Sequence, residues 1–130
     1  ETPARVDHVR QTFGLPVIKA LPISSATDVA AARIFEGHAD MLLFDAKPPA
    51  GATREGGHGA SFDWSILKGF RVHDHEDWTL SGGLTAENVA EAIAKSGAAA
   101  VDVSSGVEAR HGVKDHAKVR AFIEAAKAAG

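Results

Sequence analysis

Two short segments rich in glycine and serine are the part of the sequence best suited to chemistry. Ser81-Gly82-Gly83 and Ser104-Ser105-Gly106 each follow a run of residues typical of a β-strand. Glycines at such a junction let backbone N–H groups approach an anion, and a following helix dipole favours negative charge. Either tripeptide alone fits an ordinary strand-to-helix turn equally well. Together, after successive strands, they predict the phosphate site that (β/α) barrels build after their last two strands.

Two aspartates lie at or near the carboxyl ends of predicted strands. Asp45 ends the apolar run 41–44, at the edge of a parallel sheet where α/β active sites lie. Partial shielding from water there favours the neutral form of a carboxyl, which suits a general acid. A turn-forming or helix-capping aspartate is an equally good interpretation of Asp45. Asp102 lies within an apolar run, so either a substrate contact or a structural hydrogen bond is expected of it.

Three other features could take part in function. The long polar segment 46–61 contains Gly56-Gly57-His58-Gly59, which is typical of a lid that orders over substrate or of a flexible loop tip. Lys19 lies in an apolar strand, where it could reach a barrel mouth or extend its ammonium group to water. The polar run 73–77, with two histidines, is interpreted as a solvated turn, so no metal site is predicted.

Alternating helices and short apolar strands must position these residues. The pattern predicts helices at 3–13, 25–35, 62–67, 85–96 and from 115, and strands at 15–21, 39–45, 78–81 and 99–103. The first two strands are nearly unbroken apolar runs, as in parallel sheets buried on both faces. Such alternation favours a parallel sheet with crossover helices. Periodicity alone leaves an open doubly wound sheet and part of a barrel equally possible.

Composition excludes several classes of function. The 130 residues suit one domain, with 45% hydrophobic and 24% charged residues. The net charge is −3 and the pI about 6.2, so a nucleic-acid partner is not expected. No apolar run is long enough for a transmembrane helix. There is no cysteine, which excludes disulfides and thiol nucleophiles from these residues and makes the cytoplasm the simplest compartment.

An ordered series of motifs carries a family resemblance. The motifs are Leu43-Phe44-Asp45-Ala46-Lys47, Gly56-Gly57-His58-Gly59, Phe62-Asp63-Trp64, Leu80-Ser81-Gly82-Gly83-Leu84, Glu87-Asn88-Val89, residues 101–108 and Gly112-Val113-Lys114-Asp115. This series, which spans essentially the whole chain, resembles phosphoribosylanthranilate isomerase of tryptophan biosynthesis. His58 departs from the family pattern, which more often has Asn, Ser or Thr there.

The resemblance implies a (β/α)₈ TIM barrel, a fold that takes about 200 residues or more. By motif order, residues 1–130 would form one domain, a half-barrel running from the fourth helix to the eighth and carrying strands five to eight. The family's catalytic cysteine base on strand one, and the arginine on strand two that is thought to hold the anthranilate carboxylate, would then lie outside these residues. The expected partner is the N-terminal half of the barrel, or a second copy that covers the open half-barrel.

The resemblance also implies roles for particular residues. The reaction would be the Amadori rearrangement of N-(5-phosphoribosyl)anthranilate, with Asp45 as the general acid that protonates the ribose ring oxygen. The phosphate of this small substrate would be bound by Gly82, Gly83, Ser104, Ser105 and Gly106, with Asp102 near the substrate. No metal or organic cofactor is implied, and these residues alone are expected to be inactive. The alternatives are a non-catalytic phosphate-binding half-barrel that needs a partner and another phosphate-binding barrel enzyme, against which Phe62-Asp63-Trp64 and residues 102–106 argue.

Overall fold

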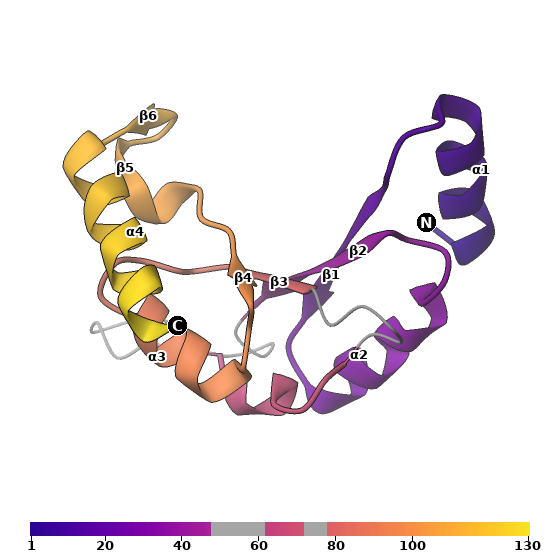
Figure 1. Cartoon of the computed structure of the whole chain (residues 1–130), viewed down its shortest axis with the longest axis horizontal. Helices are drawn as coiled ribbons and strands as arrows, with labels where there is room; N and C mark the ends of the chain where they lie inside the picture. Colours follow the sequence, from indigo (N-terminus) through magenta and orange to yellow (C-terminus); the bar gives the residue numbers. More distant parts are fainter. Residues whose placement is uncertain (48–61, 72–77) are drawn as a thin grey trace.

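The computed structural model describes residues 1–47, 62–71 and 78–130 of the chain (Figure 1). The α-helices are α1 (Pro3–Phe13), α2 (Ala26–Ala31), α3 (Val89–Ser96) and α4 (His116–Ala129), and the 3₁₀ helices are η1 (Ala32–Phe35), η3 (Trp64–Leu67) and η4 (Ser105–Val107). The strands are β1 (Ile18–Ile23), β2 (Met41–Ala46), β3 (Trp78–Ser81), β4 (Ala100–Val101), β5 (Glu108–Arg110) and β6 (Val113–Lys114). None of the described helices has the length and apolar character needed to span a membrane.

The main sheet is parallel, and its strands follow one another in chain order. The order is β1-β2-β3-β4, so each strand pairs with the next strand along the chain. A doubly wound sheet reverses its strand order and carries helices on both faces. Here the order of the described strands does not reverse, and α2 and α3 lie on the same side of the curved sheet (Figure 1). The crossover helices therefore cover one face.

The core lies between that face and the helices. Alternate residues of β2 point to it, so Leu42, Phe44 and Ala46 are buried. The ring of Phe44 has no exposed area and meets the rings of Phe70 and Trp78 edge-on, at centroid distances of 5.1 Å and 5.4 Å. Edge-to-face aromatic pairs add to the free energy of burial. This aromatic cluster joins β2 and β3 to the segment that follows η3.

The other face of β1 is open, which corrects the prediction of a strand at 15–21 buried on both faces. The strand occupies Ile18–Ile23 because its register with β2 pairs Ile18 with Met41 and Ile23 with Ala46. Ile18 is 59% exposed, and Ala20 and Pro22 are also exposed. The side chains that point to this face of β1 are therefore open to solvent.

Helix boundaries follow local signals where those signals are strong. As predicted, α1 starts after the Thr2 cap and ends at Gly14, whose φ of 62° lies in the left-handed region. The helix expected from residue 115 is α4, with Asp115 as its N-cap. The helix expected from residue 85 begins only at Val89, because the preceding residues form a turn.

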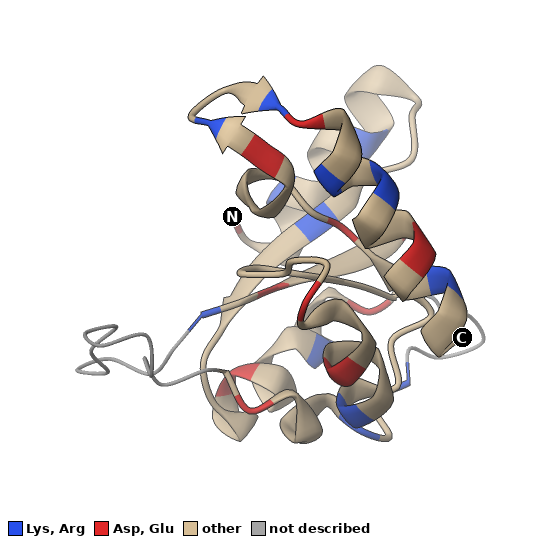
Figure 2. Cartoon of the chain, turned by 90° about the vertical axis from the view of Figure 1, so that its left-hand side faces the viewer, with Lys and Arg blue, Asp and Glu red and all other residues tan. Residues whose placement is uncertain are grey.

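The hairpin of β5 and β6 was not predicted. Its strands have three and two residues, too few to show an alternating pattern. They pair antiparallel, with Glu108 opposite Lys114 and Arg110 opposite Val113. The hairpin lies beside α4 (Figure 1), and acidic and basic residues are interspersed along both elements (Figure 2).

We expect Phe44→Ala to lower the free energy of unfolding by about 3–5 kcal/mol, because the cavity left behind adds to the lost burial. Phe13→Ala is the matched control, since Phe13 is 69% exposed. The control should change the free energy of unfolding by less than about 0.5 kcal/mol. Urea unfolding followed by far-ultraviolet circular dichroism measures both. Equal losses in the two variants would contradict the assignment of Phe44 to the core.

Candidate functional site

One cavity, of about 300 Å³, lies at the carboxyl edge of the sheet. It is lined by Asp45, Ser81, Gly82, Gly83, Leu84, Asp102, Val103, Ser104, Ser105 and Gly106. The residues that the sequence proposed for the acid, the phosphate site and the substrate contact all belong to this set. They meet because β2, β3 and β4 are parallel and in register, with Asp45 opposite Ser81 and Leu80 opposite Val101. Their chemical roles remain predictions.

Gly82 fits its position only because it has no side chain. Its φ is 95°, in the left-handed region, and it lies against the end of β2. A Cβ atom there would be 2.6 Å from Oδ1 of Asp45 and 2.7 Å from the nitrogen of Ala46, and would overlap the Ala46 carbonyl oxygen. Glycine therefore lets the loop after β3 pack directly beside Asp45.

Gly83 and Asn88 shape the rest of this loop. A Cβ atom on Gly83 would meet no heavy atom within 4 Å, so its backbone is open on that side. The Asn88 side chain donates from Nδ2 to the Gly83 carbonyl at 2.9 Å and accepts at Oδ1 from the Thr85 N–H at 2.8 Å. These bonds form the turn that delays the start of α3. Sequence reasoning gave no role to Asn88, although an asparagine just before an apolar helical run is a recognisable signal.

The loop after β4, residues 102–106, is the second loop of the cavity, and it packs against the first loop, which follows β3 at residues 82–84. The Asp102 N–H donates to the Leu80 carbonyl at 2.8 Å, which extends the pairing beyond β4. A Cβ atom on Gly106 would overlap the carbonyl oxygen of Leu84. Glycine is therefore required at two places, Gly82 and Gly106, where backbones come into close contact. Both contacts bring neighbouring backbone segments together beside the cavity.

Asp45 lies within β2, paired with Ser81, so it is neither a turn residue nor a helix cap. Its side chain is 38% exposed, and one carboxylate oxygen lies 3.4 Å from Nζ of Lys47. Such solvent-exposed ion pairs contribute little to stability. The carboxyl group is therefore accessible at the cavity, with the exposed ammonium group of Lys47 beside it.

Asp63 has a structural explanation. Its carboxylate accepts hydrogen bonds from the Ser65 hydroxyl at 2.6 Å and the Ser65 N–H at 3.1 Å, and so caps η3. These two hydrogen bonds lower the pKa of Asp63, and the bond from the Ser65 hydroxyl contributes most. It does not line the cavity. The aspartate of the Phe62-Asp63-Trp64 motif thus stabilises the start of η3.

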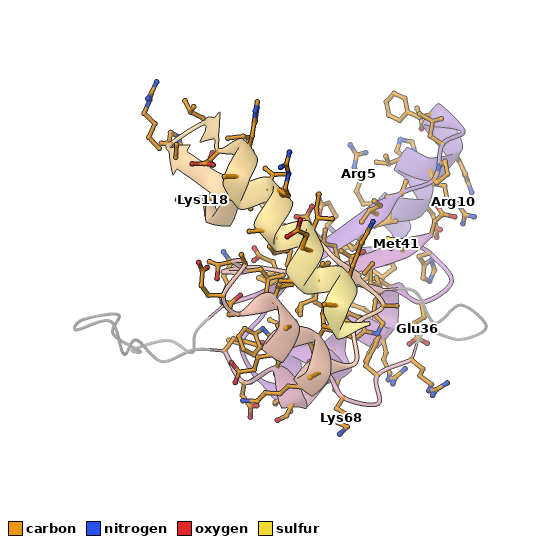
Figure 3. All side chains as sticks on the ribbon, turned by 60° about the vertical axis from the view of Figure 1, so that its left-hand side comes forward. Arg5, Arg10, Glu36, Met41, Lys68 and Lys118 are labelled. Atoms are coloured by element: carbon orange, nitrogen blue, oxygen red, sulfur yellow. The ribbon has the colours of Figure 1, made fainter. Side chains whose placement is uncertain are left out.

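Lys19 is not at the cavity. It lies on the helix-covered face of β1, with its ammonium group 2.5 Å from the Glu1 carboxylate and 5.2 Å from the centroid of the Phe35 ring. Lys19 therefore neither reaches the cavity nor extends its ammonium group freely into water. The glycine-rich segment with His58 and the two histidines of the run 73–77 lie outside the described residues. Arg5 and Arg10 of α1 do not line the cavity, and they lie at the opposite end of the molecule from Lys118 of α4 (Figure 3).

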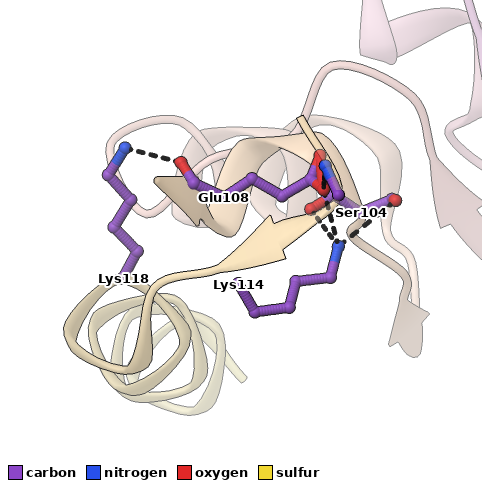
Figure 4. Close-up of polar contacts among 5 residues, drawn as sticks. Ser104, Glu108, Lys114 and Lys118 are labelled. Carbon is purple, nitrogen blue, oxygen red and sulfur yellow. Dashed lines mark hydrogen bonds and ion pairs between the residues drawn. The ribbon is translucent and has the colours of Figure 1, made fainter. Parts of the chain in front are cut away.

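Sequence reasoning also missed Lys114. This lysine, in β6, donates from Nζ to the carbonyl oxygen of Ser104 at 2.9 Å and to its hydroxyl oxygen at 3.4 Å (Figure 4). Ser104 lines the cavity and Lys114 does not, so Lys114 contacts the second loop from outside the cavity. The available signal was the Gly112 turn close after the serine-rich segment, but a hairpin this short is hard to recognise in a sequence.

Comparison with known proteins identifies the family. The family model of N-(5'-phosphoribosyl)anthranilate (PRA) isomerase matches residues 4–125. The chain belongs to the phosphoribosylanthranilate isomerase family. It is 58% identical over 127 residues to the isomerase of Rhodospirillum rubrum, covering 98% of this chain and 57% of that protein. It is 54% identical over 128 residues to the isomerase of Hyphomonas neptunium, covering 98% and 59%.

Solved isomerase structures share the fold. The isomerase of Thermotoga maritima superposes with a TM-score of 0.73 at 33% identity, covering 98% of this chain and 69% of that one. The isomerase of Pyrococcus furiosus superposes with a TM-score of 0.71 at 29% identity, covering 98% and 58%. The chain therefore has the α/β fold of this family, with its parallel sheet. It spans less than three fifths of the length of the curated isomerases named above.

Gly82→Ala should destabilise the protein more than Gly83→Ala. Both residues have a left-handed φ, 95° and 64°, so both variants bear backbone strain. Only the Gly82 variant also forces a methyl group into Asp45 and Ala46. We expect it to lose about 1–3 kcal/mol more of the free energy of unfolding, as in overpacked sites. Urea unfolding of both variants tests this, and similar losses would argue against the close approach.

Proposed function

We propose that this chain supplies the phosphate site and the general acid of a phosphoribosylanthranilate isomerase. The reaction is the Amadori rearrangement of N-(5-phosphoribosyl)anthranilate to 1-(2-carboxyphenylamino)-1-deoxyribulose 5-phosphate. The main support is the common cavity, which gathers Asp45 and both loops at one edge of the sheet. Further support comes from a related isomerase, 30% identical, whose structure contains reduced 1-(o-carboxyphenylamino)-1-deoxyribulose 5-phosphate.

The two loops would bind the substrate phosphate. The open side of Gly83 leaves room for an anion to approach the backbone. Ser104 and Ser105 add hydroxyl groups, and Gly106 lets the second loop lie close to the first. Such a site recognises phosphate mainly through N–H and O–H donors. In barrels of this kind, a phosphate site after the last two strands is a recurrent arrangement.

Asp45 would act as the general acid. It donates a proton to the ribose ring oxygen as the bond from that oxygen to C1 breaks, and the nitrogen lone pair forms the Schiff base. A base then removes the C2 proton, and the resulting enolamine tautomerises to the ketone. The chain has no cysteine, so the cysteine base that the resemblance implies would come from outside these residues. Asp102 would lie beside the substrate, and no step requires a metal or an organic cofactor.

We further propose that the chain corresponds to the C-terminal half of a (β/α)₈ barrel, with strands five to eight. The unreversed strand order, helices on one side of the sheet and an exposed inner face of β1 support this. The coverage of 57% of a curated relative is also consistent with it. The remaining half-barrel, or a second copy of the chain, would then cover the open face. The cytoplasmic location expected from the sequence stays a prediction.

A second candidate function is non-catalytic phosphate binding by a half-barrel that needs a partner. The observation that favours it is that the cavity gathers Asp45 and the loop residues proposed for phosphate, while the chain has no cysteine to act as the base. The two candidates share the same cavity. They differ in whether a base is supplied to it.

Asp45→Asn should lower kcat of the full-length natural protein by about 10²–10⁴-fold, the usual contribution of a general acid. KM should change by less than about threefold, because the amide keeps the shape of the side chain. Asp63→Asn is the matched control, since Asp63 caps η3 away from the cavity and asparagine also caps helices. Steady-state kinetics with N-(5-phosphoribosyl)anthranilate measure both variants. A nearly unchanged kcat for Asp45→Asn would remove Asp45 from the acid role.

The purified 130-residue chain by itself should not turn over N-(5-phosphoribosyl)anthranilate, because it has no cysteine base. It should still bind inorganic phosphate, since both loops are present. Substrate consumption and phosphate titration, measured on the same preparation, separate these two properties. Turnover by this chain would show that the base lies within the 130 residues.

A monomeric species on size exclusion would argue against pairing of the chain with a second copy through the open face of the sheet.

A further inference from the structure

We propose that Lys114 is a positioning residue for the phosphate site. It holds Ser104 so that the serine hydroxyl donates its hydrogen to the substrate phosphate. This inference rests on the proposed function of the cavity, and it assigns a role to a residue outside the cavity lining. The supporting observations are the contacts of Lys114, the anchoring of its hairpin and the chemistry of an ammonium group.

Lys114 contacts Ser104 at two atoms. Its Nζ donates to the carbonyl oxygen at 2.9 Å and to the hydroxyl oxygen at 3.4 Å (Figure 4). The same ammonium group lies 3.5 Å from a carboxylate oxygen of Glu108. Lys114 therefore bridges the hairpin and the second loop of the cavity.

The direction of the hydrogen bond between Lys114 and Ser104 determines what the Ser104 hydroxyl can donate to. An ammonium group has only donors, so the Ser104 hydroxyl must be the acceptor of the bond from Lys114. Its own hydrogen is then left to donate elsewhere, and Ser104 lines the cavity proposed for phosphate. The bond to the Ser104 carbonyl has a second effect. It holds the negative end of that carbonyl at the lysine rather than at a bound anion.

The hairpin holds Lys114 in place. Glu108 pairs with Lys114 across β5 and β6, and its carboxylate accepts the Gly112 N–H at 2.9 Å. The Glu108 side chain is only 11% exposed. From α4, Lys118 donates from Nζ to the Glu108 carbonyl at 2.9 Å (Figure 4). The hairpin is thus tied to a long helix, and the lysine does not depend on its own flexible chain for its position.

The positive charge adds a smaller, screened effect. The Lys114 side chain is 47% exposed, so water and salt weaken its attraction for an anion in the cavity. We therefore expect loss of Lys114 to weaken phosphate binding by about five- to tenfold, less than a buried charged hydrogen bond would give. Part of this loss should persist at high salt, because the orientation of Ser104 does not depend on screening.

The first experiment compares Lys114→Met, Lys114→Arg and Lys95→Met in the full-length natural protein. Lys95→Met is the matched control, because it removes the same charge from a similarly exposed lysine and breaks an ion pair with Glu91, while neither Lys95 nor Glu91 lines the cavity. Calorimetric titration with inorganic phosphate gives Kd, and steady-state kinetics give KM and kcat. Lys114→Met should raise Kd and KM together with little change in kcat. Lys114→Arg should recover most of the loss, and Lys95→Met should leave Kd within about twofold of the wild type.

The second experiment tests whether Lys114 acts through Ser104. Ser104→Ala and the double variant Ser104→Ala/Lys114→Met complete a double-mutant cycle with phosphate Kd as the readout. If the lysine acts by orienting the hydroxyl, the double variant should bind phosphate nearly as well as Ser104→Ala alone. Additive losses would overturn the positioning role, and so would an unchanged Kd in Lys114→Met. Melting temperatures of all variants show whether the fold is kept.

The outcomes separate this inference from the proposed function. If the wild type binds phosphate and Lys114→Met binds it equally well, only the role of Lys114 is lost. If the wild type binds phosphate and the cycle shows coupling, but no isomerisation occurs, the enzyme assignment fails and the role of Lys114 stands. If the wild type does not bind inorganic phosphate even at millimolar concentration, both are overturned.

Discussion

The close contact between backbones at the carboxyl edge of the sheet is the constraint on which the site depends. Gly82 lies against Asp45 and Ala46, and Gly106 lies against the Leu84 carbonyl. Any side chain at these two positions would separate the loops or push them away from β2. Parallel pairing brings the strand ends level, and the two glycines then let the loops close around one cavity. Asp45, the proposed acid, and the proposed phosphate site are therefore held together by backbone packing.

This construction also governs the electrostatics of the cavity. Two carboxyl groups, Asp45 and Asp102, line a site for which an anionic ligand is proposed. The donors proposed to bind that ligand are N–H and O–H groups of the loops, while the nearby cations, Lys47 and Lys114, do not line the cavity. A cation outside the lining can orient the loop without taking the place of the ligand. The cost of this arrangement is partial screening of the charge by solvent.

The hydrophobic core is strongly one-sided. On the helix side of the sheet, Phe44 and Leu80 have no exposed area, whereas Ile18 on the opposite face is mostly exposed. A sheet face of this kind is stable when something apolar covers it. The residues that line the cavity lie at the carboxyl ends of the strands of this same sheet. Covering of the open face and completion of the proposed active site are therefore proposed to occur together.

Local chemistry let the sequence alone determine several elements and the members of the site. Thr2 and Gly14 mark the ends of α1, Asp115 marks the start of α4, and the strand-end motifs named the residues that line the cavity. These signals act over a few residues, so no knowledge of distant contacts is needed. Only the tertiary structure decided the limits of β1, since pairing with β2 sets them. It alone showed that Asp63 caps a helix and that Lys114 contacts Ser104, because each depends on where folding places a partner in space.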